Sequence, residues 1–97
     1  MAESLSQQES YCTFSLCGAT CGIPVRHVRE IVCDQPITPV PLAHRSVRGL
    51  INLRGQILTV IDIACLMGLS TTDPEVPQGR FHVITETDDE LVSLTVD

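Results

Sequence analysis

The chain has 97 residues, 43% of them hydrophobic, and a formal net charge of −6. This length allows one domain, and this hydrophobic content supports a globular core and excludes a disordered chain. The negative charge argues against nucleic-acid binding, which relies on neutralising phosphates. One tyrosine and two phenylalanines are also too few aromatic residues to stack the bases of single strands.

The start of the chain predicts a mobile tail followed by a β-hairpin. Residues 1–9 are polar and lack the basic and apolar regions of a signal peptide. Residues 11–16 alternate apolar and polar side chains, which is typical of a half-buried strand. Small residues around Gly18 predict a turn, and residues 21–25 resume an extended path.

The next segment is ambiguous between helix and strand. Residues 25–33 fit both periodicities, and we expect a short helical turn that passes into a strand. Residues 34–41 contain three prolines, which predict an irregular or edge segment.

Residues 48–62 carry the strongest pattern, two runs of branched apolar residues flanking Arg54-Gly55. This pattern predicts a β-hairpin in which Gly55 supplies the positive φ that the turn needs. The second run is apolar on both faces, so we expect it to be covered on both. Arg54 at the tip could meet a partner or a carboxylate. Asp62 could act as a general base, but capping the helical turn expected at 64–67 or pairing with an arginine is favoured.

The last part of the chain predicts a polar surface loop and a third hairpin. Residues 70–79 form the loop, and residues 80–86 and 91–97 form the two strands. The final strand would be an exposed edge unless an earlier strand covers it or the chain lacks a C-terminal piece. The many short strands together predict an all-β fold of small barrels.

The charges are distributed unevenly along the chain. All six basic residues are arginine, five lie between positions 26 and 54, and seven acids lie between 73 and 97. The arginines and the acids could offset each other's charge across the surface of the protein. Alternatively, an arginine-bearing face could dock an acidic partner surface.

No catalytic set is visible, which favours a binding module over an enzyme. The five cysteines include no Cys-x-x-Cys pair, and reduced thiols in small core volumes are the favoured interpretation. The alternative is a Cys/His metal-binding or redox protein, with His27, His44 or His82 supplying the imidazole.

Residues 47–62, VRGLINLRGQILTVID, resemble the signature hairpin of the CheW-like chemotaxis coupling proteins. Matching motifs occur in the family's order at 14–16 (FSL), 22–25 (GIPV), 28–31 (VREI), 37–41 (ITPVP) and 91–97 (LVSLTVD). The resemblance covers nearly the whole chain and defines a CheW-like domain at residues 10–97.

The resemblance implies an all-β fold of two small SH3-like barrels, the second incomplete because the family continues beyond the strand that matches 91–97. It implies a cytoplasmic adaptor without enzymatic activity, cofactor, metal, nucleic-acid partner or membrane insertion. Such an adaptor links the tips of methyl-accepting chemoreceptors to the CheW-like regulatory domain of a CheA-type histidine kinase, and self-association stays open.

The resemblance also implies roles for individual residues. Glu30 and Arg54 match positions that form a salt bridge and influence coupling, and Val28 matches a position in the receptor-facing groove. The structural positions of the hairpin motif are Gly49, Asn52, Gly55 and Asp62.

Overall fold

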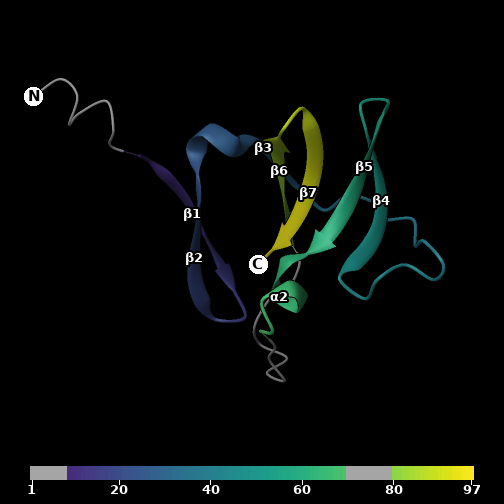
Figure 1. Ribbon diagram of the computed structural model, residues 1–97, viewed down its shortest axis with the longest axis horizontal. Helices are drawn as coiled ribbons and strands as arrows, with labels where there is room; N and C mark the ends of the chain where they lie inside the picture. Colours follow the sequence, from purple (N-terminus) through teal and green to yellow (C-terminus); the bar gives the residue numbers. More distant parts are fainter. Residues whose placement is uncertain (1–8, 70–79) are drawn as a thin grey trace, which may run out of the picture.

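The computed structural model describes residues 9–69 and 80–97, so most of the predicted tail and the whole 70–79 loop lie outside the described residues. An antiparallel hairpin of β1 (Tyr11–Leu16) and β2 (Ala19–Pro24) comes first (Figure 1). The predicted helical turn is the 3₁₀ helix η1 (Val25–His27), and it leads directly into β3. The remaining elements are β3 (Val28–Cys33), β4 (Val47–Leu53), β5 (Gln56–Asp62), α2 (Ile63–Leu66), β6 (Phe81–Thr87) and β7 (Glu90–Val96).

Five strands form one sheet in the order β3-β6-β7-β5-β4. The final strand, β7, is therefore central, with β6 antiparallel on one side and β5 parallel on the other. The final strand is thus paired on both sides, by β6 and by the earlier strand β5, as in the first alternative that the sequence left open.

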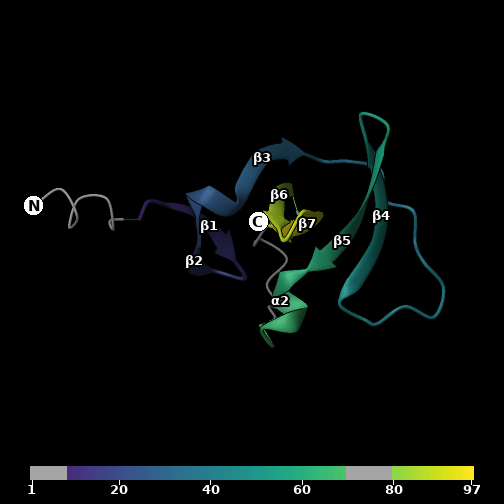
Figure 2. The same ribbon diagram turned by 45° about the horizontal axis from the view of Figure 1, so that its top comes forward.

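The sheet closes on itself at the segment that follows β3. Thr38 N donates to Leu50 O at 2.8 Å, and Leu50 N donates to Thr38 O at 2.9 Å. This bridge joins β4 to the continuation of β3, so the sheet curls into a small barrel. The all-β prediction is confirmed, and the β1–β2 hairpin stands beside the barrel (Figure 2).

The two faces of the sheet bury separate apolar clusters. Inside the barrel, Ile51, Leu58, Val60 and Ile84 are buried together. On the outer face, Val83 and Val96 pack with Leu16 of the hairpin, and side chains of β2 and α2 complete this second cluster. The hairpin thus covers the barrel over β6 and β7.

Strand β5 is covered less completely than its sequence predicts. Leu58 is 2% exposed inside the barrel, whereas Ile57 on the outer face is 59% exposed. The expected coverage of both faces was wrong at Ile57. The reason is that, among the described residues, the outer cluster contains side chains from β1, β2, β3, α2, β6 and β7 and none from β5.

Candidate partner-binding site

The tip of the β4–β5 hairpin is a two-residue turn in which Arg54 (φ 53°) and Gly55 (φ 86°) both have positive φ. This is the pattern of a type I′ turn, which matches the twist of the flanking strands. The side chain of Asn52 accepts a hydrogen bond from Gly55 N at 2.8 Å and fixes the turn. Gly55 was expected to have positive φ, but the turn type requires it of Arg54 as well.

Arg54 forms a bidentate ion pair with Glu30 of β3. Its Nη1 lies 2.5 Å from Oε1 and its Nη2 lies 2.7 Å from Oε2 of the glutamate. Two parallel bonds between planar groups fix orientation as well as distance. The pair also joins an edge strand of the sheet to the hairpin tip, although the two residues are 24 positions apart in sequence.

The pair is charged at neutral pH. The hydrogen bonds from Arg54 lower the pKa of Glu30, and those bonds raise the pKa of Arg54 in turn. The Arg54 side chain is 67% exposed and that of Glu30 is 32% exposed. Because exposed ion pairs contribute little to stability, this one mainly holds the tip and β3 in one arrangement.

A second ion pair, which the sequence did not reveal, lies nearby. Arg29 Nη1 is 2.9 Å from Glu86 Oε1, on β3 and β6 respectively. The two residues meet only through the pairing of β3 with β6, so no local sequence signal could have indicated their contact. A third pair joins Arg26 to Glu9.

Val28 lies on the other face of β3 from Glu30. The register shifts between the two residues, so that Val28 pairs with Thr85 while Glu30 pairs with the next residue, Ile84. Such a β-bulge turns the side chains on its two sides to opposite faces. Val28 accordingly packs against the outer cluster, and Val32 packs against the barrel interior. The structure therefore brings together Glu30 and Arg54 but not Val28.

Gly49 is the residue that permits barrel closure. Its φ is +145°, and a Cβ built at this position would lie 2.2 Å from Thr38 O and 2.8 Å from Ile37 Cγ2. Only a residue without a side chain lets the two backbones approach this closely. Its place in the motif is thus explained by the bridge between Thr38 and Leu50.

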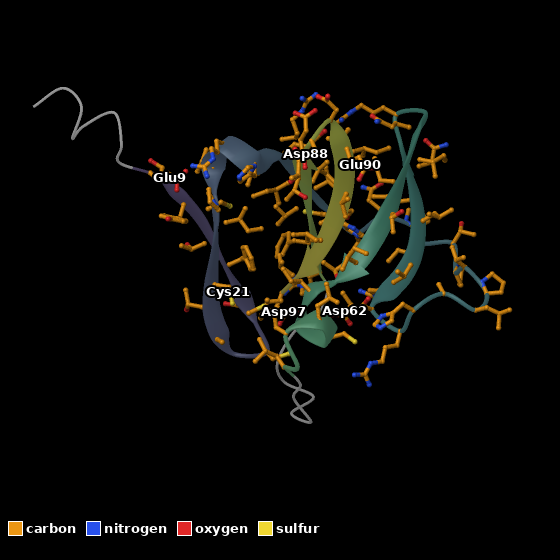
Figure 3. All side chains as sticks on the ribbon, viewed as in Figure 1. Glu9, Cys21, Asp62, Asp88, Glu90 and Asp97 are labelled. Atoms are coloured by element: carbon orange, nitrogen blue, oxygen red, sulfur yellow. The ribbon has the colours of Figure 1, made fainter. Side chains whose placement is uncertain are left out.

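Asp62 caps the short helix α2. Its Oδ1 accepts a hydrogen bond from Cys65 N at 3.2 Å, and its own backbone N donates to Ser46 O at 2.7 Å. This is the capping role that the sequence favoured. Figure 3 shows Asp62 and Asp97 at the same end of the sheet and Asp88 and Glu90 at the other.

All five cysteines are free thiols. Burial and the carboxylates of Asp97 and Asp62 raise the pKa of Cys17, which keeps it in the thiol form that is less reactive. Within residues 9–69 and 80–97, no three or more His, Cys, Asp or Glu side chains are grouped as a metal site would require. No helix in these two ranges has the length and hydropathy to cross a membrane.

A family profile described as the CheW-like domain matches residues 10–97. The chain belongs to the CheW-like domain family. A similar protein is the chemotaxis protein CheW of Rhizobium meliloti, which is 33% identical over 75 residues, covering 77% of this chain and 47% of the relative. The chemotaxis protein CheW of Thermotoga maritima is 28% identical over 97 residues, covering 100% of this chain and 62% of the relative.

A solved CheW structure has the same fold. The scaffolding protein TtCheW from Thermoanaerobacter tengcongensis matches with a TM-score of 0.81 and 30% identity, over 92% of this chain and 60% of that protein. The CheW-like chain described here thus spans between about half and three fifths of the length of these relatives.

Proposed function

We propose that this CheW-like protein is a non-enzymatic chemotaxis adaptor at the cytoplasmic tips of methyl-accepting chemoreceptors. It couples these receptors to a CheA-type histidine kinase by binding the kinase's CheW-like regulatory domain. Membership of the CheW-like family supports this function, as does the likeness to a scaffolding protein. The observation that carries the proposal is the exposed, bidentate pair of Glu30 and Arg54.

The geometry of the pair suits it to protein recognition. Arg54 uses two of its five N–H donors on Glu30, so the others are available to a partner carboxylate. Because the glutamate already orients the guanidinium, binding a partner would cost little further side-chain entropy. The connection between β4 and β5 lies at the far end of this hairpin (Figure 1), and the Arg54 side chain on it is exposed.

The test is the affinity of the Arg54→Glu variant for a purified kinase regulatory domain and for a soluble receptor fragment. We expect roughly tenfold weaker binding or more to at least one of them, because the substitution puts like charges together at the tip. The matched control is Arg29→Glu, which breaks the other exposed ion pair of β3 and should leave affinity within about twofold.

The double variant Glu30→Arg/Arg54→Glu separates two explanations. It restores an opposite-charge pair but reverses its direction. Recovered affinity would mean that the partner needs the fixed geometry, and continued loss would mean that it reads the positive charge at the tip. If Arg54→Glu binds both partners like the parent protein, the assignment of this site is wrong.

A further inference from the structure

The segment between β3 and β4 presents apolar side chains to solvent on a tight turn. Leu42 is fully exposed, at 106% of its reference area, and Val40 is also exposed. Pro41 lies between them and fixes its own φ, which shapes the turn. We call residues 40–45 the Leu42 turn.

Leu42 has φ +63°, a conformation that favours glycine or asparagine. A leucine there is strained because its Cβ is close to the backbone, and full exposure means that no packing within the described residues compensates. Leucine at this position therefore lowers the stability of the fold, and no contact within the described residues offsets the loss. Backbone strain of this kind at an exposed residue indicates a function.

Hydrogen bonds hold the Leu42 turn in place. Ala43 N donates to Val40 O at 3.4 Å, and Val47 N donates to His44 O at 2.8 Å. The backbone bridge at Thr38 fixes the segment before the turn. After it, His44 Nδ1 lies 2.7 Å from Ser46 Oγ. The turn is thus preorganised, so docking it on a partner would cost little conformational entropy.

Two exposed arginines follow the exposed leucine in the sequence. Arg45 and Arg48 are both exposed, and residues 35–48 contain no acid. Across residues 9–69 and 80–97, the ion pairs involve Arg26, Arg29 and Arg54, and neither Arg45 nor Arg48 takes part. A surface that meets this turn would complement it with an apolar pocket and carboxylates.

The Leu42 turn is separate from the Glu30–Arg54 pair. It precedes the start of β4, whereas Arg54 follows its end, and β4 is seven residues long, roughly 20 Å of extended chain. Figures 1 and 2 both show the connection before β4 projecting from the barrel away from the hairpin tip.

We propose that the Leu42 turn docks on a partner protein, with Leu42 inserted into an apolar pocket bordered by carboxylates. This goes beyond the adaptor function proposed above, since it adds a contact surface apart from the hairpin tip. The net charge of −6 opposes adsorption to an anionic membrane. A second copy offers acids at Asp88, Asp89 and Glu90, but residues 87–90 are all polar and exposed, so this turn has no apolar side chain to receive Leu42.

The first experiment places a photo-crosslinking amino acid at position 42 of the full chain in its own cells. Leu66, which is exposed on α2, is the control position. We expect a covalent adduct from position 42 alone, mapped by mass spectrometry to an apolar pocket of another protein that has Asp or Glu at its border. No adduct, or adducts only with lipid or with a second copy, would overturn the proposal.

The second experiment measures the affinity and stability of Leu42→Asn with that purified partner. Burial of one leucine predicts an affinity about tenfold weaker on its removal. Relief of the strained φ predicts a thermal midpoint about 4 °C higher. Leu66→Asn should neither change the affinity for the partner nor raise the thermal midpoint. Unchanged affinity in Leu42→Asn would contradict docking, even where the stability gain appears.

Discussion

Two glycines of the β4–β5 hairpin have positive φ for different reasons. Gly55 lies in the turn with open space around it, so its role is conformational. Gly49 is buried against the backbone of Thr38, so its role is also steric. At the scale of single residues, the hairpin motif thus combines a turn-forming glycine with one that admits another strand.

Gly49→Ala should lower the free energy of unfolding by about 2–4 kcal/mol, because the new Cβ overlaps Thr38 O and the barrel must open there. Gly55→Ala is the matched control and should cost only about 1 kcal/mol, from φ strain alone. Urea unfolding monitored by circular dichroism measures both. Equal losses in the two variants would contradict the steric role of Gly49.

The strands of the sheet differ in how completely their two faces are covered. On β5, Leu58 and Val60 point into the barrel and are buried, while Ile57 faces outward near the tip. On β3, the bulge between Val28 and Glu30 gives one strand side chains in both apolar clusters. The alternation of side chains along the strands did not by itself indicate the exposure of Ile57 or the bulge in β3.

Leu58→Ala should therefore destabilise the domain by about 2–4 kcal/mol, since it leaves a cavity inside the barrel. Ile57→Ala on the next residue should cost less than about 1 kcal/mol, because its side chain is mostly exposed. Chemical unfolding of the two variants under identical conditions tests this difference. Similar losses would mean that Ile57 is buried in solution.

For the whole molecule, a buried histidine links stability to pH. His82 is fully buried inside the barrel, and its Nδ1 lies 2.8 Å from Oγ of the buried Ser93. Burial, with a smaller effect of Arg48, lowers the pKa of His82 below its usual 6.5, and Asp34 opposes this shift. The folded state thus disfavours the protonated imidazole.

The sign of the pH effect follows from this lowered pKa. Below about pH 6.5 the unfolded chain binds a proton that the folded chain resists, so stability falls as pH falls and levels off below the folded-state pKa. We expect His82→Gln to flatten the stability profile between about pH 7.5 and 5. Measurement of the unfolding free energy across this range tests it, with His44→Gln as the exposed control. An unchanged slope in His82→Gln would assign the effect to other groups.

The sequence by itself determined the local elements and the family. Alternation and turn residues predicted the β1–β2 and β6–β7 hairpins, the helical turn before β3 and the tight turn at Arg54-Gly55. The motif at residues 47–62 predicted the CheW-like family, which the family match confirms. These features can be predicted from the sequence because they depend on neighbours within a few positions.

Only the tertiary structure decided which strands meet. The central place of β7, its parallel pairing with β5 and the closure at Thr38 join segments far apart in the chain. The bulge in β3 then decided that Val28 and Glu30 face opposite sides. The contact of Arg29 with Glu86 depends on the same pairing of β3 with β6. Strand order and register follow from the packing of the whole core, and side-chain period alone leaves them open.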